Sequence, residues 1–126
     1  MPIKLRAERA LGALKNEDVQ VMKKMGNPPP AVKLVMEATC IILKCNLTPG
    51  ADNWNAIKVQ FSNPKILQML KDIKGLNAEL ADKIGKYYIS NDDFDTKKIE
   101  KSSVPAAGLC EWIHALYDYF VIMLDI

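Results

Sequence analysis

Apolar residues along this chain recur mostly at intervals of three and four, which is the spacing of one face of an α-helix. The segment 3–25 carries two such stripes, which share one leucine and then diverge. The first stripe is Leu11, Leu14, Val21 and Met25, and the second is Ala10, Leu14, Val19 and Met22. We therefore predict one helix over residues 3–25. Its doubled stripe predicts a weakly specified pairing register with a partner helix.

Three consecutive prolines, Pro28, Pro29 and Pro30, separate this helix from the next one. Proline has no backbone N–H and a fixed φ, so three in a row end a helix. At the first turn of a new helix the missing donors cost nothing, and Asn27 is a favoured N-cap residue. The run therefore predicts a rigid corner, followed at once by a helix over residues 30–44.

This second helix is amphipathic. Its inward positions are Val32, Val35, Met36, Thr39 and Leu43. Lys33, Glu37 and Lys44 fall on the opposite face, where we expect them to be exposed. N-cap and proline signals predict further helices, which begin near Trp54, Pro64, Asn77, Thr96 and Ala106, with Val104-Pro105 ending the fourth of them. No segment has the alternating pattern of a strand.

The last predicted helix again carries two apolar stripes. They are Leu109, Trp112, Leu116, Tyr119 and Met123, and Ile113, Leu116, Phe120 and Met123. Because both ends of the chain carry heptad-like helices, we predict an all-α fold: a small helical bundle at the tip of a short antiparallel coiled-coil stalk. The predicted division is 1–25 for the first stalk helix, 26–106 for the tip and 107–126 for the start of the returning stalk helix. In the alternative, both end helices only cover the core of the bundle.

Charge and composition narrow the possible partners. The chain has 126 residues and a net charge of +2, which is too small to favour nucleic acid. Residues 1–50 hold eight Lys/Arg against four Asp/Glu, so a local positive patch facing an acidic protein surface is expected. No apolar run reaches the roughly 18 residues of a membrane span, and no signal peptide is visible, so we expect no membrane partner. The pattern stops abruptly at Ile126, and we expect the chain to be a piece of a larger protein.

The residues that could do chemistry are sparse. Cys40 and Cys110 lie among apolar residues and, with Cys45, make an odd set without zinc spacing, so buried free thiols in a reducing compartment are expected. The single histidine, His114, lies between core positions and is predicted to be structural. Phosphate-binding loops and nucleophile elbows are absent from the sequence. We therefore expect no catalysis, no metal site and no cofactor in this chain.

A binding surface is the remaining possibility. The candidate residues are lysines at helix starts or on one short helix: Lys33, Lys58, Lys65, Lys97 and Lys101. Each lysine alone is best explained as a solvated charge, but the group clusters around two corners of a small domain. Lys97 and Lys101 also share a helix face by their i,i+4 spacing.

Four sequence blocks carry a resemblance to a known family. They are Asn-Pro-Pro-Pro-Ala-Val-Lys-Leu-Val-Met-Glu-Ala at 27–38, Asn53-Trp54, Tyr88-Ile89-Ser90-Asn91, and Gly108-Leu109-Cys110-Glu111-Trp112. In order and spacing they resemble the microtubule-binding domain of dynein heavy chains, over essentially the whole chain. The Val-Met-Glu-Ala sequence at 35–38 is similar to that of axonemal members of the family. This similarity implies that the protein is located in the cytoplasm, on the cytoskeleton of the ciliary axoneme.

The resemblance implies a stalk tip that docks on α/β-tubulin through Lys33, Lys58 and Lys101. Lys97 is added because it shares a face with Lys101. Asn63 stands where the family often has a basic residue, so part of the positive charge is assigned to Lys65. The resemblance also implies that the ATPase of the motor lies elsewhere in the heavy chain, and that a slide between the two stalk helices controls affinity.

Two other functions remain open from the sequence. A generic helical interaction or scaffold module would show the same composition and would not bind tubulin. A nucleic-acid-binding helical domain is more distant, because the chain has no platform of alternating aromatic and basic residues.

Overall fold

The computed structural model describes residues 3–26, 28–49 and 51–124, and within these ranges all regular structure is helical. The helices are α1 (Ile3–Gly12), α2 (Asn16–Lys23), α3 (Pro30–Ile42), α4 (Trp54–Phe61), α5 (Ile66–Lys71), α6 (Ala78–Ile84), the π-helix η1 (Gly85–Ile89), α7 (Thr96–Glu100) and α8 (Val104–Leu124). The predicted all-α fold is thus confirmed. Among these described helices, none combines the length and hydropathy that a membrane span requires.

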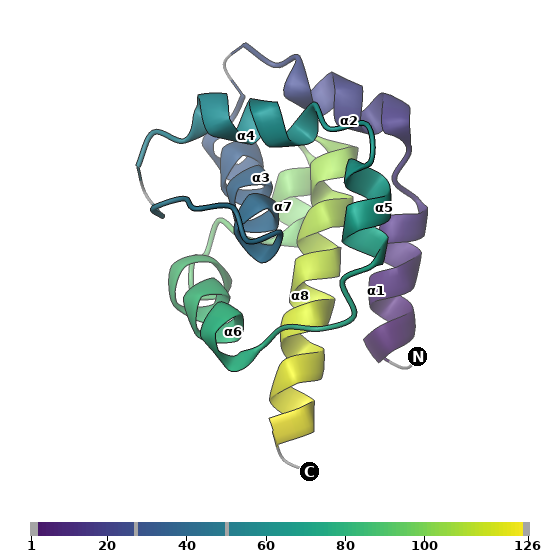
Figure 1. Ribbon diagram of the computed structural model, residues 1–126, viewed down its shortest axis with the longest axis vertical. Coiled ribbons are helices and arrows are strands. Elements are labelled where there is room, and N and C mark those ends of the chain that lie inside the picture. Colours follow the sequence, from purple (N-terminus) through teal and green to yellow (C-terminus); the bar gives the residue numbers. More distant parts are fainter. Residues whose placement is uncertain (1–2, 27, 50, 125–126) are drawn as a thin grey trace.

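Helix α8 is the central element of the molecule (Figure 1). Helices α1, α3 and α7 all pack against it. Its residues between Ala106 and Leu116 are buried on several sides: Ala106, Ala107, Leu109, Cys110, Trp112, Ile113, Ala115 and Leu116. Both apolar stripes predicted for this helix are therefore buried at once along its first half. The doubled stripe follows from α8 being surrounded by other helices, and each face of the helix meets a different neighbour.

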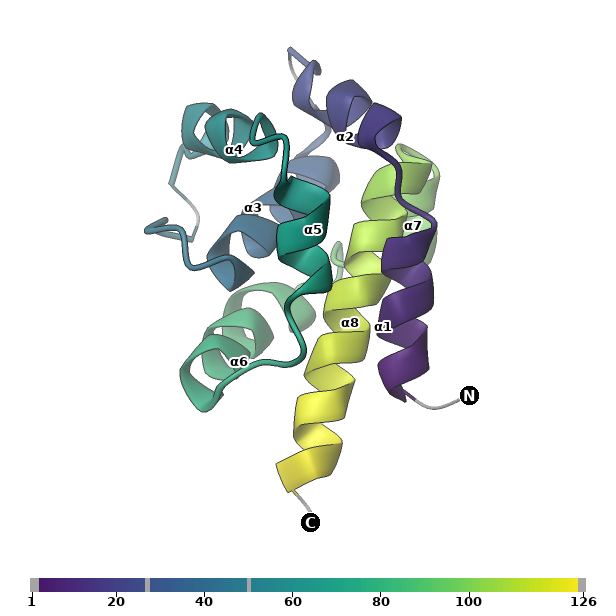
Figure 2. The ribbon, with the colours of Figure 1, turned by 45° about the vertical axis from the view of Figure 1, so that its right-hand side comes forward.

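Helices α1 and α8 form an antiparallel pair, and both termini lie at the same end of the molecule (Figures 1 and 2). Ala7 and Leu11 of α1 are buried against α8. The two backbones approach closely: a Cβ atom placed on Gly108 would lie 3.7 Å from the carbonyl oxygen of Ala10. The predicted antiparallel pairing of the chain ends is confirmed. The apolar side chains from Val121 to Leu124 are exposed beyond the reach of α1.

The prediction of one continuous helix over residues 3–25 is wrong. Helix α1 ends at Gly12, and Lys15 adopts an extended conformation with φ −114° and ψ 163° before α2 begins. The side chain of Asp18 accepts a hydrogen bond from the backbone N–H of Lys15 at 2.9 Å, which satisfies a donor at the start of α2. Glycine has a low helix propensity, and acidic residues favour the first turn of a helix, so the sequence supplies both a stop and a start.

This break explains the doubled stripe in the first segment. Leu11 and Leu14 precede or lie within the break, whereas Val19 and Met22 belong to α2 and enter the core from another direction. Val21, which belonged to the other predicted stripe, is 58% exposed. Each stripe thus combines positions from two separate helices. The stripes are not alternative seams of one helix.

The proline corner forms as predicted. Pro30 is the first residue of α3, and the carbonyl of Pro29 accepts hydrogen bonds from the N–H groups of Val32 and Lys33. Pro28 is buried, which fixes the corner against the bundle. The N-cap predicted at Asn27 lies outside the described residues.

Side-chain caps define the later helices. Asn77 accepts a hydrogen bond from the N–H of Leu80, which confirms the predicted start there, and Asp95, just before the start predicted near Thr96, accepts one from the N–H of Lys98. Val104 and Pro105, predicted to end a helix, instead begin α8, where the Ser103 hydroxyl accepts a hydrogen bond from the N–H of Ala106. Proline suits this position because the first turn needs no backbone donor.

Candidate functional site

The end of the molecule opposite both termini is formed by α2, α4 and the beginnings of α3, α5 and α8 (Figures 1 and 2). We call this end the distal face. Lys33 lies in the first turn of α3, Lys58 in the last turn of α4, and Lys65 at the N-cap position of α5. Lys101 is the C-cap residue of α7, three residues before α8 begins.

The structure brings some of the predicted lysines together and leaves one apart. Helices α3 and α4 pack against each other, which joins the elements that carry Lys33 and Lys58. Lys65 follows α4 after three intervening residues. Lys97 lies about one turn of α7 before Lys101, and α7 packs along α8. Lys97 is therefore further from the start of α8 than Lys101.

The side chains of these five lysines are available for binding. Lys65, Lys97 and Lys101 are exposed, and Lys33 and Lys58 are half-buried. Within the part of the chain that the structure describes, none of the five ammonium groups forms an ion pair or a hydrogen bond. Neighbouring Lys98 differs, because its ammonium donates to the carbonyl of Asp92 at 3.2 Å and so ties the start of α7 to the preceding loop.

Lysines stand at the N-terminal ends of α3 and α5, where the helix dipole disfavours positive charge. A helix N-terminus carries a partial positive charge and favours acidic residues in its first turn. Neither α3 nor α5 has an acidic residue in its first turn, and each has a lysine there or at its cap. Positive side chains and positive helix ends therefore coincide on the distal face. Such a surface favours an acidic partner.

Two further basic residues on this face were missed from the sequence. Lys23 ends α2 and Lys24 is its C-cap residue, and α2 packs against α4 on the distal face. They were missed because residues 3–25 were predicted to be a single stalk helix. The signal for the break was Gly12 followed by an Asn-Glu-Asp helix start at residues 16–18.

Glu37 was predicted on the exposed face of α3, and that prediction is wrong. Its side chain is buried and accepts a hydrogen bond from the Tyr88 hydroxyl at 2.5 Å and one from Nδ2 of Asn53 at 3.0 Å. A buried carboxylate is tolerated only where hydrogen bonds satisfy it. Helical periodicity placed Glu37 opposite the core, but η1 and the loop before α4 cover that side of α3. The carboxylate thus joins α3 to two other elements.

The loop between α3 and α4 is fixed by the same network. Asn53 also donates to the carbonyl of Thr48, which closes the end of the loop. At its beginning Lys44 has φ 68°, and the N–H groups of Lys44 and Cys45 bond to the carbonyls of Ile41 and Cys40. These two hydrogen bonds together form a Schellman C-cap. The position of α4, and with it Lys58, is therefore tied to both ends of this loop.

The π-helix η1 lies against α8 at its first residue, Gly85. A Cβ atom placed on Gly85 would lie 2.8 Å from the hydroxyl oxygen of Tyr117, so any other residue at this position would require the Tyr117 ring to move. The wider turn buries Tyr88 while Tyr87 stays exposed. A π-helix has i→i+5 hydrogen bonds in place of the i→i+4 bonds of an α-helix, so one π-turn shifts the face that the following residues present. Here the shift aims Tyr88 at Glu37.

The cysteines are structural. Cys40 and Cys110 are buried and all three thiols are free. Burial raises the pKa of the Cys40 thiol well above its ordinary range and that of Cys110 to about 11. Within the described residues, no group of three or more His, Cys, Asp and Glu side chains is placed to hold a metal ion.

Because the pKa values of these buried thiols are raised, we predict that the folded chain loses stability at alkaline pH. A group whose folded pKa is raised contributes stability below its unfolded pKa, here 9.0, and loses it at higher pH because only the unfolded chain then ionises. We expect the free energy of unfolding in urea to fall as pH rises from about 9 toward 11. Cys110→Ala should show a smaller fall than the parent over the same range. An equal fall in both proteins would contradict this.

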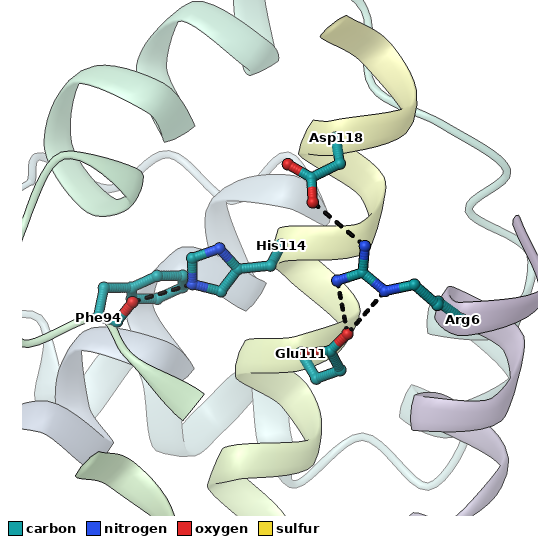
Figure 3. A network of polar contacts seen from close by, with 5 residues as sticks. All are labelled: Arg6, Phe94, Glu111, His114 and Asp118. Carbon is teal, nitrogen blue, oxygen red and sulfur yellow. Dashed lines mark hydrogen bonds and ion pairs between the residues drawn. The ribbon is translucent and has the colours of Figure 1, made fainter. Parts of the chain in front are cut away.

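Charged and polar residues also join α8 to its neighbours (Figure 3). Arg6 of α1 donates from Nη2 and Nε to Oε1 of Glu111, at 2.7 and 3.0 Å, and from Nη1 to Oδ2 of Asp118 at 3.3 Å. These contacts raise the pKa of Arg6, the hydrogen bond with Glu111 most. His114 donates from Nε2 to the carbonyl of Phe94 at 2.9 Å, so the predicted structural role of this histidine is confirmed.

Comparison with known proteins gives a consistent result. The family model of the microtubule-binding stalk of dynein motor matches residues 1–126. The chain is 32% identical over 128 residues to the dynein-1-beta heavy chain of the flagellar inner arm I1 complex of Chlamydomonas reinhardtii, and 31% identical over 131 residues to dynein axonemal heavy chain 3 of Mus musculus. These matches cover 100% and 94% of this chain, and the chain spans 3% of the length of each relative.

A solved structure shares the fold. The microtubule-binding domain of dynein-c superposes with a TM-score of 0.79 at 31% sequence identity, covering 98% of this chain and 86% of that one. Its helical architecture matches the predicted bundle. The family model covers the entire chain, and the two relatives named above are a flagellar inner arm and an axonemal heavy chain. This chain belongs to the family of the microtubule-binding stalk of dynein motors.

Proposed function

We propose that this chain docks on the microtubule surface through its distal face, with Lys33, Lys58, Lys65 and Lys101 as the main contacts and Lys97 at the margin. The observation that carries the proposal is that these lysines have no internal partners within the described residues, and that two of them, Lys33 and Lys65, coincide with the N-termini of helices that begin on the distal face. Lys23 and Lys24 add to the same positive surface. Tubulin is the acidic partner that membership in this family implies.

The two ends of the chain then have separate tasks. We infer that α1 and the C-terminal half of α8 are the end of the stalk, and that the exposed apolar residues 121–124 continue its seam. The division at 1–25, 26–106 and 107–126 stays a prediction, and the packing of α2 on α4 favours a first boundary near Ala13. The parent protein would be an ATP-driven motor of the ciliary axoneme, joined to this chain through the stalk.

The test is co-sedimentation of the chain with polymerised tubulin, alongside a duplex DNA control. We expect saturable binding to microtubules that weakens as salt rises, because the attraction between exposed charges is screened within about 10 Å at 0.1 M salt. Binding to DNA should be far weaker. If the folded chain stays in the supernatant at low salt, a general helical interaction module is the better interpretation. Equal binding to DNA would indicate a nonspecific polycation.

A further inference from the structure

Arg6 holds α1 to α8 through two carboxylates that lie one heptad apart. Glu111 and Asp118 are seven residues apart on α8, which corresponds to a rise of about 10.5 Å along the helix. The guanidinium contacts both at once, so it lies between them along the axis of α8 (Figure 3). A displacement of α1 by about 5 Å in either direction would bring Arg6 level with one carboxylate and out of reach of the other.

Helix α8 is fixed in the bundle by neighbours on several sides, whereas α1 packs mainly against α8 alone. Leu109, Trp112 and Ile113 of α8 are fully buried in the core, and His114 bonds to the loop before α7. Among the described side chains, α1 buries only Ala7 and Leu11, fewer than α8 does. Relative motion along the axis would therefore be a displacement of α1 along α8.

The three side chains that form these ion pairs are partly exposed to solvent. The side chains of Arg6, Glu111 and Asp118 are 33%, 36% and 48% exposed. Single exposed ion pairs contribute little to stability, so removing one of them should leave the fold intact. Its effect should fall on the choice between alternative positions of α1, which differ in which pair they keep.

We propose that Arg6 is the positioning residue that sets the axial register of α1 on α8, because Glu111 and Asp118 draw it in opposite directions. With both carboxylates present, α1 takes the central position seen in the structure. With Asp118 neutralised, the remaining pair with Glu111 draws α1 toward the distal face. With Glu111 neutralised, the pair with Asp118 draws α1 away from it.

The position of α1 reaches the proposed binding face through the chain. Residues 13–15 join α1 to α2, and the proline corner joins α2 to the helix that carries Lys33. This step rests on the proposed microtubule function, whereas the positioning role of Arg6 does not. The two can therefore fail separately.

The first test measures the register directly, in the whole chain without microtubules. Spin labels on cysteines at Leu5 of α1 and Val104 of α8, both exposed, report the axial offset in a Cys45→Ser background, since Cys40 and Cys110 are buried. We expect Asp118→Asn to shorten the mean distance and Glu111→Gln to lengthen it, by up to about 5 Å.

Two further variants serve as checks on the register. Arg6→Gln should broaden the distribution toward both sides, and Arg9→Gln, on the same helix without an ion pair in the described structure, should leave it unchanged. The exchange Arg6→Glu with Glu111→Arg should give a narrow distribution displaced toward the distal face, because the pair between positions 6 and 111 remains while Asp118 now repels. Shifts in the same direction for both carboxylate variants, or no shift in any folded variant, would overturn the positioning role.

The second test measures microtubule affinity for the same two carboxylate variants. We expect their dissociation constants to differ from each other by threefold or more, since they move α1 in opposite directions. Opposite displacements with equal affinities would support the role of Arg6 and contradict the coupling to the binding face. A parent chain that does not bind microtubules would refute the proposed function and leave the distance measurement to decide on Arg6.

Discussion

Replacing Lys33 by glutamate is expected to weaken microtubule binding at least tenfold, which is about 1.4 kcal/mol. The change reverses one charge on the distal face and places a carboxylate against an acidic partner, where like charges repel. Lys33 has no internal partner in the described structure, so nothing within the fold depends on its ammonium group. Co-sedimentation with polymerised tubulin over a range of tubulin concentrations measures the effect.

The same substitution should not destabilise the fold. Lys33 lies in the first turn of α3, where an acidic residue interacts favourably with the helix dipole by about 0.3–1 kcal/mol. The free energy of unfolding should therefore stay equal or rise slightly while binding is lost. The matched control is Lys71→Glu, an exposed lysine in the last turn of α5, the end of that helix nearer the termini. If Lys71→Glu weakened binding as much as Lys33→Glu, the assignment of the distal face would be wrong.

Much of the fold could be predicted because its signals are local. The proline corner, the caps at Asn77 and Asp95 and the apolar spacing of α8 each depend on a few neighbouring residues. The antiparallel pairing of the chain ends followed from their matching heptads. Val104-Pro105 was misread because proline can follow one helix or begin another, and only the Ser103 cap decides between them.

What the sequence could not show depends on contacts between distant segments. Glu37 is buried because Tyr88, 51 positions later in the sequence, donates a hydrogen bond to it from the π-helix η1. The residues near Glu37 in the sequence give no signal for this partner. The break after Gly12 was hidden by two apolar stripes that fit a single helix equally well. Lys33 and Lys65 were found because they stand at helix starts, and Lys58 and Lys101 through the resemblance to the family, but Lys23 and Lys24 were assigned to the stalk together with the predicted helix. Whether the five lysines bind tubulin stays a prediction.

Removing the buried carboxylate of Glu37 should be the most damaging change to the fold among these polar residues. Glu37→Ala leaves the Tyr88 hydroxyl and the Asn53 amide without their partner and opens a cavity, for an expected loss of about 2–4 kcal/mol of unfolding free energy. Tyr88→Phe removes one hydrogen bond to a buried charge and should cost about 1.5–3 kcal/mol. Urea unfolding of both single variants and of the double variant measures the coupling, and the double variant should lose less than the sum.

Tyr87→Phe is the matched control for this network, because Tyr87 is the preceding residue and is 44% exposed. It should change the free energy of unfolding by less than about 0.5 kcal/mol. Burial, and then the bond to Glu37, raise the pKa of Tyr88 far above the ordinary value of 10.0. The stability due to Tyr88 is therefore complete below pH 10 and declines above it, where the unfolded chain ionises and the folded one does not. Tyr88→Phe should remove this part of the alkaline decline and Tyr87→Phe should keep it. Equal costs for the two variants at pH 7 would show that the Glu37 network does not hold α3 in place.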